Sequence, residues 1–153
     1  MEITASQHAE HRHLLQVYGQ LPLETTSAEG VYLHAGKRRI IDFYGGHAVA
    51  GLGYAHPDLL ATLERQSKSM YFQSNAVALE VRALAADALV AFAPAGLNRV
   101  FFVNSGAEAN ENALRVACRA TGRSRVLAIE HGFHGRTAAA AAVLGVMSPA
   151  ELP

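Results

Sequence analysis

The stretch VFFVNSGAEAN at residues 100–110 is the feature that most constrains the fold. Four apolar residues are followed at once by small polar residues and then by residues that favour a helix. A continuous apolar run is typical of a strand that is covered on both faces of a sheet. Ser105 and Glu108 have the spacing of a helix capping box. The stretch therefore predicts a buried strand that ends at Val103 and a helix that begins near Ala107.

This alternation of strand and helix continues along the second half of the chain. The expected elements are strands at 99–103 and 125–129 and helices at 107–121 and 137–144. Strands that alternate with helices in this way indicate βαβ units and a parallel sheet.

The first half of the chain has a different pattern. It predicts helices at 5–18, 57–70 and 78–92 and a β-hairpin within residues 30–46 that turns at Ala35-Gly36-Lys37. A glycine-rich loop follows the hairpin, and Pro57 is well suited to the first turn of a helix. We therefore place a domain boundary near residues 54–57, which divides the chain into segments 1–55 and 56–153.

Composition excludes several classes of protein. Of 153 residues, 50% are hydrophobic and 17% are charged, which is typical of a globular chain. The 13 basic and 13 acidic residues balance, so charge does not favour nucleic acid or an anionic membrane. The single cysteine, Cys118, excludes an internal disulfide and favours a reducing cytoplasm. The polar N-terminus has no apolar core of a signal peptide.

The start of the helix at 107–121 is a candidate anion site. The first amide hydrogens of a helix have no intrahelical partner, and the helix dipole places partial positive charge there. Phosphate binds such helix ends readily, and the Ser105 hydroxyl can donate one more hydrogen bond. An ordinary capped helix is the alternative, and the spacing alone favours it.

A second loop, EHGFHGRT at residues 130–137, also follows an expected buried strand. Ligands of doubly wound sheets bind at the carboxyl ends of the strands, where both loops are expected to lie. Phe133 offers a ring that can stack on an aromatic cofactor, and Arg136 offers a guanidinium that can bind a carboxylate through two hydrogen bonds. Taken singly, Phe133 is better explained as a core residue and Arg136 as a surface charge.

Together, VFFVNSGAEANENALRVACRATGR and EHGFHGRT closely resemble the class III, ornithine-type aminotransferases that use pyridoxal phosphate. The upstream stretch GKRRIIDFYGGHAVAGLGYAHPDLLATLERQ is similar to the corresponding segment of that family. The resemblance implies an α/β chain with an incomplete type I aminotransferase fold. Residues 1–55 would be the helix and β-hairpin of the small domain, and 56–153 the start of the large, mainly parallel-sheet, cofactor-binding domain. It also implies a homodimer.

The resemblance implies roles for individual residues. Ser105, Gly106 and Ala107 would bind the cofactor phosphate, and Phe133 would stack on its pyridine ring. Arg136 would bind the α-carboxylate of glutamate or 2-oxoglutarate. Residues that lie near the substrate in acetylornithine enzymes correspond to Ser74 and Asn75. The family often continues there with aromatic residues, whereas this chain has Ala76 and Val77.

The family's cofactor lysine has no counterpart here. Only Lys37 and Lys68 occur in the sequence, and both precede the candidate phosphate loop. Because that lysine forms the Schiff base and carries the proton in transamination, no catalytic residue is assigned in this chain. The resemblance also fades after Thr137. We therefore expect an inactive N-terminal fragment of a cytoplasmic transaminase, for an amine or acetylornithine-like ω-amino acid and 2-oxoglutarate.

Other interpretations remain open or are weaker. The chain could be a non-catalytic subunit or binding protein that pairs with a full-length or complementary chain. A Rossmann-type nucleotide binder is disfavoured, because no G-x-G-x-x-G follows the first strand. His8, His11 and His13 cluster, but no acidic or cysteine side chain completes a tetrahedral set, so no metal site is expected.

Overall fold

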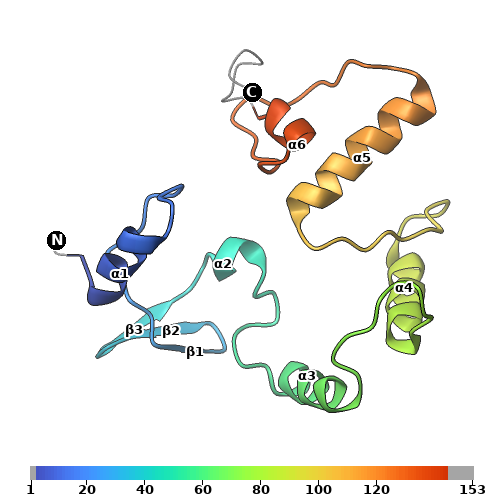
Figure 1. The fold of residues 1–153 in the computed structure, drawn as a ribbon. Coiled ribbons are helices and arrows are strands. Elements are labelled where there is room, and N and C mark those ends of the chain that lie inside the picture. The colour runs from blue at the N-terminus through green and yellow to red at the C-terminus, as the bar shows by residue number, and fades with distance from the viewer. Residues whose placement is uncertain (1–2, 145–153) are drawn as a thin grey trace. The chain divides into compact units, whose positions relative to one another are not determined.

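The computed structural model describes residues 3–144, in which two compact units are separated at the bond between Val77 and Ala78 (Figure 1). The first unit contains helix α1 (Ala5–His13), a three-stranded sheet, the short turn α2 (Gly45–Ala48) and helix α3 (Pro57–Ser69). The second unit contains helices α4 (Glu80–Phe92), α5 (Gly106–Thr121) and α6 (Ala138–Ala142). The boundary predicted near residues 54–57 concerns domains of a complete fold, and it stays a prediction.

The sheet of the first unit is antiparallel, in the order β1-β2-β3. Its strands are β1 (Ser27–Glu29), β2 (Tyr32–Ala35) and β3 (Arg38–Ile41). Ala35 pairs with Arg38, so that Gly36 and Lys37 form the hairpin turn. Gly36 has a φ of 59°, which glycine adopts without strain. The predicted hairpin is therefore confirmed, and β1 adds a third strand to it.

A left-handed turn follows the hairpin. All four residues of α2 have φ between 56° and 61°, including the non-glycine residues His47 and Ala48. Such conformations are costly for residues with a Cβ atom and persist only where surrounding contacts hold them. Tyr44 contacts both residues, because its hydroxyl is hydrogen-bonded to the His47 ring and its carbonyl accepts the Ala48 amide at 3.0 Å. The Asp42 carboxylate holds the start of the turn, since it accepts the Gly45 amide at 3.0 Å and the Tyr54 hydroxyl at 2.6 Å.

Helix boundaries largely follow the capping signals. α3 begins at Pro57 as predicted, and α5 begins one residue before the predicted Ala107. The first helix is shorter than expected, because α1 ends at His13 and Leu14 is already extended. A capping box of Thr4 and Gln7 fixes the start of α1.

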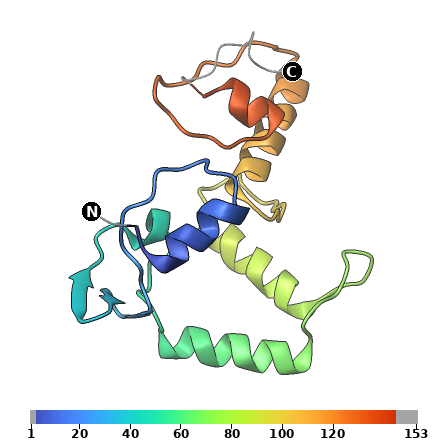
Figure 2. The same cartoon turned by 60° about the vertical axis from the view of Figure 1, so that its left-hand side comes forward.

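The expected parallel sheet is not formed in residues 3–144. Segments 99–103 and 125–129 belong to no hydrogen-bonded strand, and they do not pair with each other. Both segments run as plain coil on either side of α5 (Figure 2). The prediction of strands at 99–103 and 125–129 is therefore wrong for this structure, because an apolar run becomes a strand only where a neighbouring strand takes its backbone hydrogen bonds.

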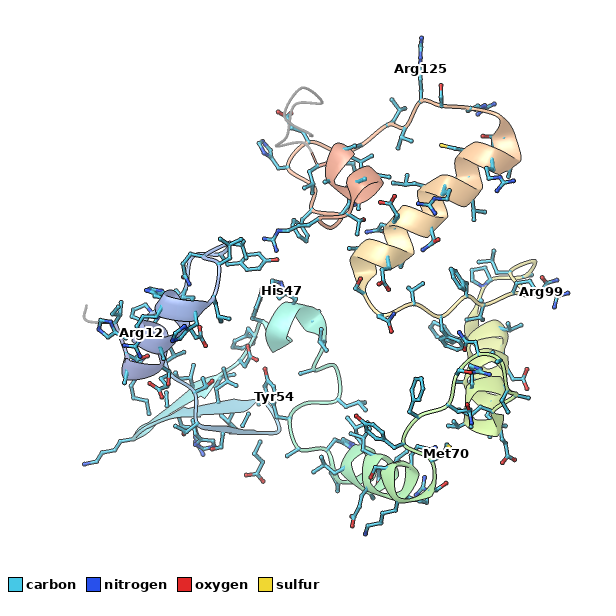
Figure 3. The ribbon with its side chains drawn as sticks, in the orientation of Figure 1. Arg12, His47, Tyr54, Met70, Arg99 and Arg125 are labelled. Atoms are coloured by element: carbon cyan, nitrogen blue, oxygen red, sulfur yellow. The ribbon has the colours of Figure 1, made fainter. Side chains whose placement is uncertain are left out.

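The core is correspondingly small. Among the described residues, the buried hydrophobic ones are Ala140 and Ala141 of α6, whereas Phe101 is 73% and Leu127 is fully exposed. Arg125, which opens the second extended segment, also points outward (Figure 3). The buried alanines lie where α6 packs against α5. No helix within residues 3–144 is both long and apolar enough to cross a bilayer.

Candidate active site

The N-terminus of α5 is an open, capped helix end. Ser105 is the N-cap, and its Oγ accepts the amide hydrogen of Glu108 at 3.2 Å. The Glu108 carboxylate accepts from the amide of Asn104 at 2.6 Å and not from Ser105, so the predicted capping box is formed with a shift of one residue. A Cβ atom placed on Gly106 would meet no atom within 4 Å. The Cβ side of Gly106 is therefore open, and the amides of Gly106 and Ala107, as the first of the helix, have no intrahelical partner.

Loop 130–137 contacts this helix end directly. Gly135 is buried, and a Cβ atom at this position would lie 2.5 Å from Ala107 Cβ. Its φ of 126° is also a conformation that side-chain-bearing residues rarely adopt. Only glycine therefore permits this approach of the two segments, which the sequence analysis expected at one sheet edge.

Phe133 and Arg136 lie on the exposed side of the loop. The Phe133 side chain is 64% exposed, so it is not a core residue. The guanidinium carbon of Arg136 lies 5.7 Å from the centre of the Phe133 ring, within the range of a cation–π contact. The same short loop thus presents a flat ring and a planar cation beside each other.

Ser74 and Asn75 belong to the first unit, in the segment between α3 and α4. Both residues are exposed. Ser74 Oγ accepts the amide hydrogen of Ala76 at 3.2 Å, and the Ser74 carbonyl accepts from Val77 at 3.3 Å. These bonds define a turn, and the substrate role of Ser74 and Asn75 stays a prediction.

Two residues of α5 that the sequence analysis did not single out hold the loop. Asn110 Nδ2 donates to the His134 carbonyl at 2.7 Å, and Glu111 Oε2 accepts the Thr137 hydroxyl at 2.8 Å. The hydrogen bond from Thr137 is the largest of several contacts that lower the pKa of Glu111. The sequence positions of Asn110 and Glu111 could have indicated this role, because residues three and four places after Ala107 lie on the same helix face as Ala107.

The chemistry of this site fits a phosphorylated aromatic cofactor. The helix end offers unpaired amides, a hydroxyl and partial positive charge for a phosphate group. Phe133 offers a surface for ring stacking, and Arg136 offers a donor pair for a carboxylate. Among the residues described, no group of three or more His, Cys, Asp or Glu side chains is arranged to hold a metal ion. The site thus has the chemistry to bind an anionic ligand that carries an aromatic ring.

Residues 16–150 match the class III aminotransferases, so the chain belongs to this family. An acetylornithine aminotransferase of Methanosarcina acetivorans is 37% identical over 136 residues. That match covers 88% of this chain and 34% of the relative, so the chain spans about a third of the relative's length. Members of the class III family use pyridoxal 5′-phosphate, which agrees with the predicted cofactor.

Solved structures lead to the same fold. The taurine:2-oxoglutarate aminotransferase of Bifidobacterium kashiwanohense, solved in complex with pyridoxal phosphate and glutamate, is 28% identical with a TM-score of 0.81. The match covers 95% of this chain and 34% of that protein. A transaminase from the marine bacterium Virgibacillus is 20% identical with a TM-score of 0.83, covering 93% of this chain and 36% of that one. The backbone is therefore that of a partial aminotransferase fold, as predicted.

Proposed function

We propose that this chain supplies the cofactor-phosphate site and the substrate-carboxylate site of a pyridoxal-phosphate-dependent transaminase. The observation that carries the proposal is the contact of Gly135 with Ala107, which brings the aromatic and cationic loop to an open helix end. An isolated capped helix would explain Ser105 alone. It would not explain why Phe133 and Arg136 are held beside it.

The Ser105 hydroxyl and the amides of Gly106 and Ala107 would hold the cofactor phosphate, because the helix dipole favours an anion there. Phe133 would stack on the cofactor ring and exclude water from one of its faces. When bound, pyridoxal phosphate supplies an electron sink for bond breaking at the amino carbon. The chain's own residues orient the cofactor and carry no proton in this scheme.

Arg136 binds the α-carboxylate of the substrate through its planar fork, while Ser74 and Asn75 contribute to the donor site. We propose 2-oxoglutarate as acceptor and an acetylornithine-like ω-amino acid or amine as donor. Support comes from the names of the relatives, one an acetylornithine aminotransferase and one a taurine:2-oxoglutarate aminotransferase. The small side chains of Ala76 and Val77 set this donor site apart from the aromatic pattern noted above.

We further propose that the 153-residue chain alone is inactive, because Lys37 and Lys68 both precede the phosphate loop. A complete enzyme would be a cytoplasmic homodimer, in which residues 1–55 belong to the small domain and 56–153 to the large domain. The expectation that the resemblance fades after Thr137 is wrong, because the family match extends over residues 16–150. Residues 145–153 lie outside the described range. The second candidate function, a non-catalytic subunit, is favoured by the extended segments 99–103 and 125–129, which lack strand partners in residues 3–144.

A chimera tests the proposed function. Residues 16–150 would replace the matching third of the Methanosarcina acetivorans relative, and glutamate formation from 2-oxoglutarate and N-acetylornithine would be measured. We expect activity in the chimera and none in the 153-residue chain. In the chimera, Arg136→Lys should lower kcat/KM for 2-oxoglutarate by about thirtyfold, since the bidentate contact contributes about 2 kcal/mol. Transamination by the chain alone, or an unchanged kcat/KM in the Arg136→Lys chimera, would contradict the proposal.

A further inference from the structure

Two adjacent residues of α5 bind the loop on both sides of Arg136. Asn110 holds the carbonyl of His134 before it, and Glu111 holds the hydroxyl of Thr137 after it. The backbone is thereby fixed at both ends of a segment whose central side chain remains exposed. Such an arrangement restricts where the Arg136 guanidinium can lie without contacting the guanidinium itself.

Glu111 makes the larger set of contacts. Besides Thr137, its Oε2 accepts the amide of Ala139 at 2.8 Å and that of Ala140 at 3.2 Å. Only 17% of the Glu111 side chain is exposed, and Arg115 lies 3.4 Å from its other oxygen. The two amides belong to the first turn of α6, where a negative charge is favourable. The carboxylate thus takes the place that an anion would occupy at α6, whereas the end of α5 stays open.

The contacts form one continuous face on α5. Ala107, Asn110 and Glu111 lie three and four residues apart on the same side of the helix, and each contacts the loop or the start of α6. Because a helix is stiff over its first two turns, contacts on this face fix the position of the loop relative to the helix N-terminus. A shift of about 1 Å between reacting groups is enough to impair an active site.

We propose that Asn110 and Glu111 are positioning residues that hold Phe133 and Arg136 in register with the phosphate-binding end of α5. They act through the backbone of the loop and touch neither cofactor nor substrate. The inference rests on the proposed function of the loop. Its mechanical part, that Asn110 and Glu111 hold the loop in place, concerns only contacts within the second unit. Glu111 has the larger effect, because one oxygen accepts three hydrogen bonds.

The mechanical part is tested by amide hydrogen exchange on the full 153-residue chain. Glu111→Gln replaces a charged oxygen by a neutral one, so the amides of Ala139 and Ala140 should exchange about tenfold faster. The matched control is Glu64→Gln in α3, since Glu64 also pairs with a basic residue four places on, Lys68, at 2.5 Å. The control should leave the exchange of both alanine amides unchanged. Equal exchange in Glu111→Gln and the unaltered chain would overturn the proposal.

The functional part is tested by fluorescence titration with pyridoxine 5′-phosphate, which has no aldehyde and so forms no bond with Lys37 or Lys68. Affinity should fall about fivefold in Glu111→Gln and in Thr137→Val, and it should be retained in Thr137→Ser, which keeps the hydroxyl. Faster exchange with unchanged affinity would refute the positioning role alone. Failure of the unaltered chain to bind would contradict the cofactor site itself, and the exchange data would still show whether Glu111 holds the loop.

Discussion

The hairpin of the first unit and the extended segments of the second unit differ in where their backbone hydrogen bonds go. Strands β2 and β3 lie next to each other in sequence and pair across a two-residue turn. Segments 99–103 and 125–129 have a strand-like apolar composition, yet no strand pairs with them in the described range. An antiparallel hairpin needs only local chain, whereas parallel strands need partners separated by a crossover.

The glycine-rich loop of the first unit also forms its backbone hydrogen bonds with residues of the same unit. Gly30 and Tyr54 exchange two backbone hydrogen bonds at 2.9 and 2.7 Å, and Asp42 accepts the Tyr54 hydroxyl. The glycine-rich loop thus pairs several of its polar groups within the first unit, including the left-handed turn, whereas the buried His56 Nδ1 has no hydrogen-bond partner among the described residues. In the second unit, Asn110 and Glu111 of α5 hydrogen-bond loop 130–137, but no strand pairs with the adjoining extended segments in residues 3–144. Local contacts of the family fold, including the antiparallel sheet, therefore form within a third of the length of its relatives, and the expected parallel sheet does not form in residues 3–144.

The largest expected effect is in hydrogen exchange across the whole chain. Amides in the ladder of β2 and β3 should exchange about a hundredfold more slowly than those of 99–103 and 125–129, because exchange follows the free energy of local opening. Mass spectrometry of proteolytic fragments measures this directly. Equal protection in both regions would mean that the extended segments find strand partners, for example in a second copy of the chain.

Gly53→Ala should destabilise the first unit, because it should disrupt the close approach of the glycine-rich loop to Gly30. Gly53 has a φ of 78°, and a Cβ atom there would lie 2.7 Å from the carbonyl oxygen of Gly30. Strain of this kind costs about 1–3 kcal/mol, which a shift of the urea midpoint followed by circular dichroism would report. The matched control is Gly51→Ala, because a Cβ atom at Gly51 meets nothing within 4 Å. If both variants unfold at the same urea concentration, the close approach of Gly53 does not constrain the loop.

Acid should weaken both units through carboxylates that accept hydrogen bonds, among them Asp42 in the first unit and Glu111 in the second. The hydrogen bond from Tyr54 lowers the pKa of Asp42 below its ordinary 3.8, and that from Thr137 lowers the pKa of Glu111 below its ordinary 4.5. A carboxyl with a lowered folded pKa adds stability above its unfolded pKa and loses it as pH falls through the folded value. The urea concentration at the unfolding midpoint should therefore decrease as the pH is lowered from about 5 to about 3.

The double variant Asp42→Asn, Glu111→Gln checks the origin of this acid response. It should show a smaller decrease over the same range, because both groups no longer titrate. An unchanged acid response in the double variant would show that other groups are responsible.

The smallest effect is expected at Leu127. This side chain is fully exposed, so Leu127→Asp should change the free energy of unfolding by less than about 0.5 kcal/mol while reducing self-association. Leu33→Asp is the comparison in the paired region, since Leu33 is half-buried in β2 and its replacement should be clearly destabilising. Sedimentation velocity and urea unfolding of both variants separate solubility from stability. A large loss of stability in Leu127→Asp would show that the segment packs in solution.

Local signals in the sequence predicted local structure well. The turn at Gly36 and Lys37 and the starts of α3 and α5 follow from glycine, proline and serine chemistry that acts over a few residues. The left-handed turn at 45–48 was missed, because His47 and Ala48 disfavour positive φ and are held by side-chain and backbone contacts with Tyr44. The strand at 99–103 was predicted wrongly, since an apolar run indicates that a segment can form a buried strand but not whether a partner strand is present.

The candidate site shows the same limit. Ser105 and loop 130–137 were predictable, because each is a short motif with a chemical meaning. The role of Glu111 was not, because its partner Thr137 lies 26 residues away and only the contact of Gly135 with Ala107 brings them together. The donor-site role of Ser74 and Asn75 remains a prediction.

The central claim is that the N-terminus of α5 binds the phosphate of a pyridoxal-type cofactor. It is tested most directly by titrating the isotope-labelled chain with pyridoxine 5′-phosphate and with pyridoxine, and following the amide resonances by NMR. We predict saturable shifts at Gly106 and Ala107 with the phosphorylated compound, weaker binding in Ser105→Ala, and no comparable shifts with pyridoxine. Shifts of equal size with both compounds, or shifts that leave Gly106 and Ala107 unaffected, would contradict the claim.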